Sequence, residues 1–202
     1  MSHYYSTQPD VAHQYEQFNF ELKGKNFRFT TDSGVFSKAT IDYGSRVLID
    51  TFEASHLPEG AILDVGCGYG PIGLSLAYAT KRMVEMVDVN ERALDLAKRN
   101  AEDNQITTVD IHASNLYDNV HQKNYAAIVS NPPIRAGKKV VHEILSKAYE
   151  YLLPQGSLTI VIQKKQGAPS AQKKMQEIFG NATILKKDKG YYIIQSIKEN
   201  TE

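Results

Sequence analysis

The stretch AILDVGCGYGPIG (residues 61–73) decides the fold of this chain. It begins with an apolar run that suits a buried strand, continues with glycines at Gly66, Gly68 and Gly70, and opens a helix at Pro71. Glycines are needed where the backbone turns sharply and a ligand approaches it without a Cβ in the way. A strand, a glycine loop and a helix in this order predict a ligand-binding unit of an α/β fold.

The acidic residue Asp64, two positions before the first glycine, separates two classes of cofactor. Read from Gly68, the loop also satisfies the G-x-G-x-x-G pattern of a nicotinamide dinucleotide site. A dinucleotide brings a pyrophosphate, which a nearby carboxylate repels, whereas S-adenosylmethionine brings an ammonium and a sulfonium, which a carboxylate attracts. Asp64 therefore favours S-adenosylmethionine, and a nicotinamide-dependent oxidoreductase is the alternative from another enzyme class.

Further candidate cofactor residues follow the next two predicted strands. Asp88 is the next-to-last residue of the run MVEMVDV (83–89), at the end of the strand, where a carboxylate accepts ribose hydroxyls in either cofactor class. Asn115 follows the run TTVDIHA (107–113) and can hydrogen-bond an adenine ring or act as a plain turn residue. No metal site is predicted. The predicted cofactor residues are Asp64, Gly66, Cys67, Gly68, Tyr69, Gly70, Asp88, Val89, Ser114, Asn115 and Asn131.

Strand and helix patterns alternate along the chain. Apolar, β-branched runs predict strands at 61–65, 83–89, 107–113, 125–130, 157–162, 182–187 and 191–198. Helical patterns cover 42–55, 71–78, 91–104 and 138–152. The alternation predicts a three-layer α/β sandwich with a mostly parallel seven-stranded sheet, and the turn Lys189-Gly190 makes the last two strands a C-terminal antiparallel hairpin. Residues 1–32 are expected to be an N-terminal segment with a short hairpin around 22–31, and residues 33–202 a single domain.

Length and composition exclude several classes of protein. The 202 residues suit one domain, and no apolar run reaches the roughly 20 residues that span a bilayer. The single cysteine, Cys67, excludes an internal disulfide and a Cys-rich zinc site, so we expect a cytoplasmic protein. Cys67 is expected to be a small buried residue rather than a nucleophile, because no histidine lies near it in sequence.

Charge is distributed unevenly although the net charge is zero. Residues 1–130 hold 11 Lys and Arg against 17 Asp and Glu, a charge of −6, and residues 131–202 hold 12 against 6, a charge of +6. The asymmetry is consistent with a polyanionic partner near the C-terminal half or with ordinary solvated helix faces.

A second motif, SNPPIRAGK (130–138), follows the predicted strand YAAIVS (125–130) at the edge where open α/β sheets bind ligands. Two prolines make this exit rigid and expose carbonyl acceptors, and Asn131 adds a side-chain carbonyl. Two rigid acceptors suit an NH2 group, whose lone pair they can aim at a methyl donor. Asn131 and the Pro132 carbonyl are therefore the predicted catalytic groups, although the motif also suits a simple strand-ending turn.

The two motifs together resemble those of amino-group methyltransferases. With GVFSKATIDYGSRVLIDTF (34–52) upstream, the chain resembles the catalytic half of the ribosomal RNA small-subunit methyltransferase C family over roughly residues 25–197. The resemblance implies a Rossmann-like class I fold, S-adenosylmethionine as cofactor, and methylation of the guanine 2-amino group in small-subunit ribosomal RNA. It also implies cofactor contacts by Asp64, Gly66, Gly68 and Asp88, and base contacts by Asn131, Pro132, Ile134 and Phe36.

The chain departs from the family pattern in two ways. Ile134 stands where an aromatic residue usually stacks on the base, so Phe36, Tyr43 or Tyr69 is expected to supply that face. Longer members carry a further N-terminal domain that these residues do not include, so a monomer or a homodimer is expected. Adenine amino groups, glutamine side-chain amides and a non-catalytic RNA-binding module remain alternatives.

Basic residues beside the second motif are predicted to bind the phosphates of ribosomal RNA or of a small ribosomal subunit particle. The predicted substrate-binding residues are Pro133, Ile134, Phe36, Arg135, Lys138 and Lys139, with Lys164, Lys165, Lys173 and Lys174 as further phosphate contacts.

Overall fold

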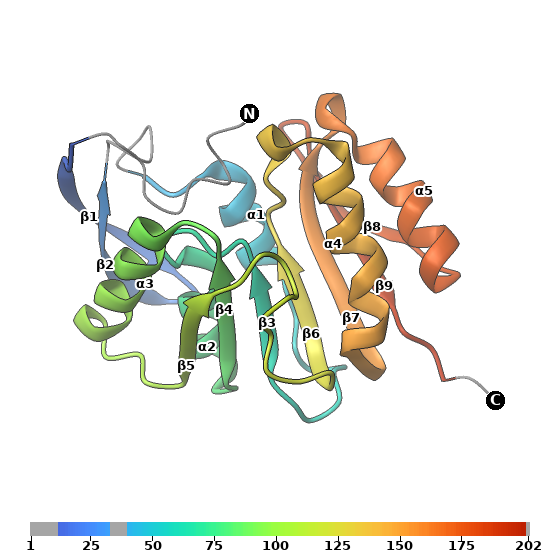
Figure 1. Ribbon diagram of the computed structural model, residues 1–202, viewed down its shortest axis with the longest axis horizontal. Helices are drawn as coiled ribbons and strands as arrows, with labels where there is room; N and C mark the ends of the chain where they lie inside the picture. Colours follow the sequence, from blue (N-terminus) through green and yellow to red (C-terminus); the bar gives the residue numbers. More distant parts are fainter. Residues whose placement is uncertain (1–11, 33–39, 201–202) are drawn as a thin grey trace.

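A seven-stranded sheet is the middle layer of the computed structural model, which describes residues 12–32 and 40–200 (Figure 1). The strands run in the order β5-β4-β3-β6-β7-β9-β8; β9 is antiparallel to both β7 and β8, and the other neighbouring pairs are parallel. The predicted fold class is confirmed. The strands are β3 (Ile62–Val65), β4 (Val84–Asp88), β5 (Val109–Ala113), β6 (Tyr125–Ser130), β7 (Leu152–Gln163), β8 (Thr183–Asp188) and β9 (Tyr191–Ile197).

The sheet order reverses between β3 and β6. From β3 the chain builds outward through β4 to β5, and it then returns to β6 on the other side of β3. Open α/β sheets bind ligands at such a reversal, in the crevice outside the carboxyl ends of the strands. Asp64 pairs with Val129 in the β3–β6 register, so the glycine loop and the proline exit leave the sheet side by side.

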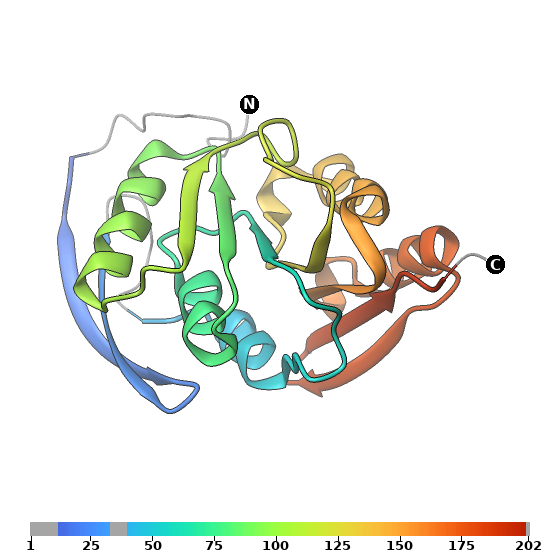
Figure 2. The same cartoon turned by 90° about the horizontal axis from the view of Figure 1, so that it is seen from below.

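Helices cover both faces of the sheet (Figures 1 and 2). One apolar cluster joins three helices to one face, and a second cluster joins the other two helices to the opposite face. No helix within residues 12–32 and 40–200 combines the length and apolar character needed to cross a membrane. The helices are α1 (Tyr43–Thr51), α2 (Pro71–Thr80) and α3 (Glu91–Asp103) on the first face, and α4 (Lys138–Tyr151) and α5 (Ala168–Phe179) on the second.

Local chemistry sets where these helices begin. The Asp42 carboxylate accepts from the Ser45 backbone N–H at 3.1 Å and caps α1. Gly70 has a φ of 109° and leads into α2, where Pro71 suits the first position. A Cβ on Gly73 would lie 2.6 Å from the Met86 sulfur, so a glycine here allows α2 to pack closely against β4.

The N-terminal segment forms a separate antiparallel hairpin of β1 (Tyr15–Leu22) and β2 (Lys25–Asp32). Its turn is Lys23-Gly24, so the hairpin begins earlier than the predicted position around residues 22–31. The residues of β1 are mostly exposed, and Phe18, Phe20 and Leu22 alternate with polar residues, which is why no continuous apolar run indicated that strand.

Asn100 of α3 and Asn104, which caps the end of this helix, hold the hairpin against the domain. The Asn100 Oδ1 accepts from the Thr30 N–H at 2.8 Å, and its Nδ2 donates to the Thr30 carbonyl at 2.9 Å. One helical turn later, Asn104 makes the same pair of bonds with Arg28, at 2.9 and 2.8 Å. The side-chain amides thus satisfy backbone groups of β2 as a neighbouring strand would.

Strand β7 begins earlier than the predicted range 157–162. It starts at Leu152, directly after α4, and passes through Pro154, where the sequence predicts a loop. The Gly156 carbonyl accepts from the Lys198 N–H at 2.9 Å, and the ladder to β6 shifts register between Tyr125 and Ala127. An irregularity of this kind allows a proline within a strand.

Candidate functional site

Asp64, near the carboxyl end of β3, is fully buried. Among the described residues, neither of its carboxylate oxygens has a hydrogen-bond partner. Burial raises the pKa of the Asp64 carboxyl to about 7; the nearby Gly73 backbone N–H opposes this change, and the Asp88 charge adds to it. A buried carboxylate without a partner is costly, and a cation placed beside it relieves that cost. The site therefore suits a positively charged ligand group, as S-adenosylmethionine carries.

The glycine loop is tied to the next strand through Asp88. The Gly68 N–H donates to Asp88 Oδ2 at 2.9 Å, and the Asn90 N–H donates to Asp88 Oδ1 at 2.9 Å. Burial raises the pKa of Asp88, while these backbone donors oppose the change. Gly66 and Gly68 have φ values of 77° and 57°, a left-handed conformation that favours glycine. The hydrogen bonds to Asp88 thus join the glycine loop to the end of β4.

Two side chains of the loop face the protein interior. The Cys67 thiol is buried, and burial raises its pKa, so it is not poised as a thiolate nucleophile. Tyr69 packs edge-on against Phe18 and Phe29, and its hydroxyl donates to the Thr40 carbonyl at 3.2 Å. The Tyr69 ring is therefore engaged within the fold, and only its backbone lies in the loop.

The predicted adenine-side residues lie after β4 and β5. Val89 is half-buried directly after Asp88. The Ser114 hydroxyl donates to the Leu116 carbonyl at 2.8 Å and accepts from the Asn119 N–H at 2.9 Å, so it shapes the turn. Asn115 is exposed in that turn.

Asn131 is held by groups at the start of α1. Its Nδ2 donates to Asp42 Oδ2 at 2.9 Å and to Ser45 Oγ at 3.0 Å. Because a carboxylate only accepts hydrogen bonds, this contact assigns the amide nitrogen to the Asp42 side. Both amide hydrogens are thereby used, and the Asn131 carbonyl oxygen accepts no hydrogen bond from the part of the chain that the structure describes. Asn131 thus presents an acceptor.

The residues after Asn131 turn quickly into α4. Pro132 is buried, and Pro133 precedes a single 3-10 turn, Ile134–Ala136. Ile134 is partly buried and packs against the apolar cluster of the second face. Arg135 is exposed on this turn, and Lys138 and Lys139 are exposed at the start of α4.

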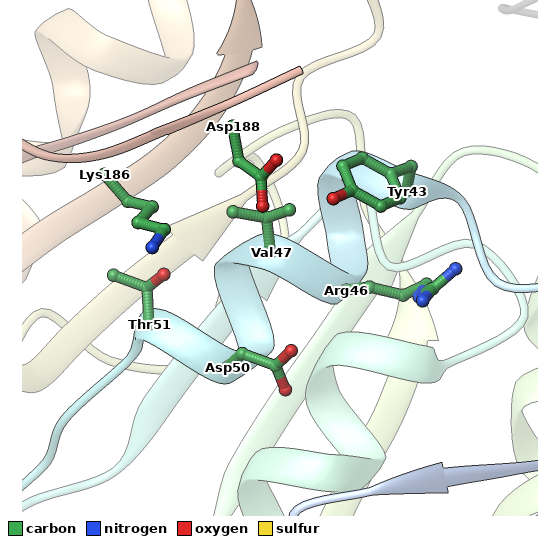
Figure 3. Close-up of a pocket in the computed structure, with 7 residues that line it drawn as sticks. All are labelled: Tyr43, Arg46, Val47, Asp50, Thr51, Lys186 and Asp188. Atoms are coloured by element: carbon green, nitrogen blue, oxygen red, sulfur yellow. The ribbon is translucent and has the colours of Figure 1, made fainter. Parts of the chain in front are cut away.

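The structure narrows the choice of a base-stacking ring. Phe36 lies outside the described residues. The Tyr43 ring contacts Tyr191, and the Arg46 and Lys189 cations lie 5.2 and 4.7 Å from its centre. Tyr43 lines a surface pocket of about 430 Å³ between α1 and β8. Figure 3 shows Val47 and Thr51 of α1 facing Asp188 and Lys186 in this pocket. The Tyr43 ring thus contacts Tyr191, Arg46 and Lys189, and the Tyr69 ring packs in the core, so both rings already have partners within the fold.

Sequence reasoning missed two residues of the site, Asp42 and Ser45. The pattern of an aspartate followed three residues later by serine at the start of a predicted helix was visible, and it indicates a helix cap. Nothing local indicates that the same carboxylate contacts Asn131, which is 89 residues away.

The geometry defines a class of protein. A glycine loop between β3 and α2, a carboxylate at the end of β3 and of β4, and this strand order are those of a class I S-adenosylmethionine-dependent methyltransferase. The model of the methyltransferase small domain family matches residues 26–195, and the chain belongs to this family. Its cofactor is S-adenosylmethionine.

Similar proteins include one of nearly the same length and several longer ones. The uncharacterized protein YbxB of Bacillus subtilis (strain 168) is 56% identical over 198 residues, which is 97% of this chain and 98% of that protein. Ribosomal RNA small subunit methyltransferase C of Buchnera aphidicola is 32% identical over 187 residues, 90% of this chain and 56% of that protein. This chain thus spans about half of the ribosomal RNA methyltransferases that it matches.

A solved structure supports the fold. The Thermus thermophilus 16S rRNA N2 G1207 methyltransferase, in complex with AdoMet and guanosine, superimposes with a TM-score of 0.82 at 22% identity. The match covers 95% of this chain and 52% of that chain.

Proposed function

We propose that this chain transfers a methyl group from S-adenosylmethionine to an exocyclic amino group, the 2-amino group of guanine in small-subunit ribosomal RNA. The proposal depends on the two hydrogen bonds that the Asn131 side-chain nitrogen donates to Asp42 and Ser45. An asparagine whose amide nitrogen is held by protein groups keeps its carbonyl oxygen as an acceptor, and next to a rigid proline carbonyl it is suited to accept both hydrogens of an NH2 group.

The chemistry follows from where these acceptors lie. S-adenosylmethionine supplies the methyl group when it is bound beside Asp64 and the glycine loop. Asn131 and the Pro132 carbonyl would hold the substrate nitrogen and draw its lone pair out of conjugation, toward the adjacent cofactor site. Positioning and electrostatics then lower the barrier without a strong base, since the proton leaves the nitrogen after transfer.

Two kinds of similarity support ribosomal RNA as the substrate. The longer relative from Buchnera aphidicola is a ribosomal RNA small subunit methyltransferase, and the Thermus thermophilus structure holds guanosine. These names describe the substrates of the two similar proteins. For this chain, the guanine 2-amino group as methyl acceptor is part of the proposal.

Charge at the start of α4 also supports an RNA partner. Lys138 and Lys139 occupy the first turn of this helix, which has no acidic residue. Cations at a helix N-terminus oppose the helix dipole, so their presence is unfavourable unless an anion lies nearby. Phosphates of RNA would provide that anion.

The test is methyl transfer from radiolabelled S-adenosylmethionine to under-methylated small ribosomal particles, free ribosomal RNA and protein extract. Label in guanine N2 of the RNA is the expected result. Label in adenine or in protein would replace the proposed substrate by another amino group, and cofactor binding without transfer to any of them would refute catalysis.

Removing either partner of Asn131 is expected to lower kcat by about 10-fold with little change in KM, on the scale of one lost hydrogen bond to a charged group. Ser45→Ala removes one acceptor and keeps the backbone N–H that Asp42 caps. Asp42→Asn removes the charge, and asparagine caps helices as well as aspartate does. Steady-state kinetics of both variants measure the effect.

The matched control for these variants is Asp50→Ala, an exposed aspartate on the same helix. Normal kcat in Ser45→Ala and Asp42→Asn, in folded protein, would contradict the positioning role. Equal losses in the Asp50 variant would show that the effect comes from helix stability.

Neutralising Arg135, Lys138 and Lys139 together as glutamines is expected to weaken RNA binding and flatten its salt dependence. Each lost phosphate contact lowers the slope of log K against log salt by about 0.7–0.9. Filter binding at several salt concentrations measures the slope. The control replaces three exposed lysines elsewhere, Lys81, Lys98 and Lys123, with the same change in charge; an equal change in slope would argue against a local RNA contact.

A further inference from the structure

A second group of polar side chains lies on β4, β5 and the connection that follows β5. Glu85 and Asp110 are opposite each other in the β4–β5 register, and His112 lies two residues further along β5 on the same face. His121 comes from the connection between β5 and β6, which crosses in front of β3 and β4 in Figure 1. One ligand atom from each of the four side chains lies within 4.8 Å of the others.

This cluster is separate from the methyl-transfer site. Glu85 is the second residue of β4, whereas Asp88 is the last, so the two carboxylates start from positions about 10 Å apart along the strand. The glycine loop and the proline exit lie beyond the carboxyl ends of their strands. The cluster therefore has no part in the proposed chemistry.

Glu85 is a buried carboxylate that is held in one orientation. The Glu85 Oε1 accepts from the Tyr125 hydroxyl. The Glu85 Oε2 lies 2.7 Å from His112 Nε2 and accepts from the backbone N–H of His121 at 3.2 Å. Partners of this kind fix the orientation of carboxylates that bind metals. Glu85 is thus preorganised as a ligand.

His112 has an oxygen beside each ring nitrogen. Its Nδ1 lies 3.2 Å from the Ala113 carbonyl, and its Nε2 faces Glu85. A neutral imidazole carries one N–H, so one nitrogen presents a lone pair to an oxygen. A histidine that binds a metal commonly donates its other N–H to a backbone carbonyl. With Nδ1 donating to Ala113, the Nε2 lone pair and the Glu85 carboxylate are both left for a cation.

The second histidine completes the set. The His121 ring stacks on the His112 ring, with centroids 4.2 Å apart, and His121 Nδ1 lies 2.8 Å from Asp110 Oδ2. Two imidazoles and two carboxylates form a nitrogen and oxygen ligand set that suits Zn²⁺. Two carboxylates also match the double charge of the ion. We propose that Glu85, Asp110, His112 and His121 form a zinc site.

The described geometry is close to a zinc site but requires a small adjustment. Bonds of about 2.0–2.2 Å to nitrogen and oxygen bring neighbouring ligand atoms closer together than the 4.8 Å span here. Parallel rings do not direct their lone pairs at one point, so one ring has to turn. His121 is the exposed ligand and lies on a loop, so it can turn while the ligands on β4 and β5 stay in place.

The site would stabilise β4 and β5 on the second face of the sheet, where the connection after β5 packs rather than α2 and α3, which cover the first face. On the second face, the connection at 114–124 packs over β3 and β4 through Leu116 and Tyr117, next to α4. A metal ion that binds His121 together with two strands would tie this connection to the edge of the sheet, close to the turn that carries Asn115.

Zinc binding by tag-free, EDTA-treated protein tests the proposal. Calorimetry and elemental analysis after gel filtration are expected to find one Zn²⁺ per chain, and Co²⁺ to give a visible absorption band. His121→Asn and Asp110→Asn should each weaken zinc binding by at least about 10-fold. Loss of an outer-shell partner already costs about 10-fold or more, so loss of a direct ligand should cost at least as much. His56→Asn, a change at an exposed histidine elsewhere, should leave binding unchanged.

Absence of stoichiometric zinc would overturn the proposal, as would equal affinity in wild type and the two ligand variants. A loss of binding in His56→Asn would assign the metal to surface histidines and overturn it too. Circular dichroism shows whether the variants fold, and because the His121 side chain is exposed and that of Asp110 is only partly buried, these substitutions leave the buried core intact.

Discussion

Replacing Asn131 with alanine is expected to lower the rate of methyl transfer by at least about 10²-fold, the scale of losing one preorganised polar contact in a transition state. The substitution removes the carbonyl oxygen proposed to hold the substrate NH2 group, and it leaves Asp64 and the glycine loop unchanged. Affinity for S-adenosylmethionine should therefore stay nearly unchanged. Single-turnover methyl transfer and calorimetry with the cofactor measure the two quantities separately.

Two further variants sharpen this experiment. Asn131→Asp keeps a carbonyl-type oxygen but places a second carboxylate against Asp42, 2.9 Å from the present amide nitrogen, so it should also lose activity. Asn26→Ala, at an exposed position of the hairpin, is the control and should be fully active. Full activity of Asn131→Ala would refute the catalytic role of Asn131.

Replacing Asp64 with asparagine is expected to weaken S-adenosylmethionine binding by at least about 30-fold, on the scale of 2 kcal/mol for a lost partner in a buried charge pair. The same substitution should stabilise the ligand-free protein, because it removes a buried carboxylate whose oxygens have no partner among the described residues. Each kcal/mol gained raises the Tm by about 2–4 °C in a chain of this size. Thermal unfolding with and without cofactor measures both effects.

The difference in Tm between Asp64→Asn and the wild type should change with pH in a defined direction. The pKa of Asp64 is about 7 in the folded protein, above the value of about 3.9 for an unfolded aspartate. Between these two values the folded state binds more protons than the unfolded state, so the contribution of Asp64 to stability falls as pH rises from about 4 to about 7. The Tm advantage of Asp64→Asn should grow over this range and then level off.

The affinity of the wild type for S-adenosylmethionine should rise with pH, whereas the contribution of Asp64 to stability falls. The ionised carboxylate is the form that attracts the cationic cofactor, so affinity should rise with pH up to about 7. Asp95→Asn, a change at an exposed position of α3, is the matched control and should show neither effect. Unchanged cofactor affinity in Asp64→Asn would contradict the role of Asp64.

Much of the fold was predictable from local patterns. The glycine loop, the proline exit and the apolar runs each depend on neighbouring residues, and β6 has the predicted bounds Tyr125–Ser130. The errors fall where local signals are weak. Strand β1 is largely exposed and has no continuous apolar run, and Pro154 indicates a loop although a register shift in the ladder includes it in β7.

The candidate site was predicted less completely, because residues distant in sequence build it. The motifs that contain Asp64, Gly68 and Asp88 are local, and their residue types are typical of a cofactor site. The parallel strands β3 and β4 bring these residues to one edge of the sheet. Asp42 indicates only a helix cap, yet it also orients Asn131. Such a second role depends on where α1 packs.

The amino-acid sequence alone determined the class of fold and the kind of cofactor, because the motifs that indicate them consist of residues adjacent in the chain. The chemistry of the NPP exit stays a prediction. Only the tertiary structure decided which groups meet: Asp42 with Asn131, Asn100 with the backbone of β2, and Glu85 with His112 and His121. Hydrogen bonds between distant residues depend on how helices and strands pack, and no local pattern records that packing. The orientation of Asn131 is therefore a property of the folded chain.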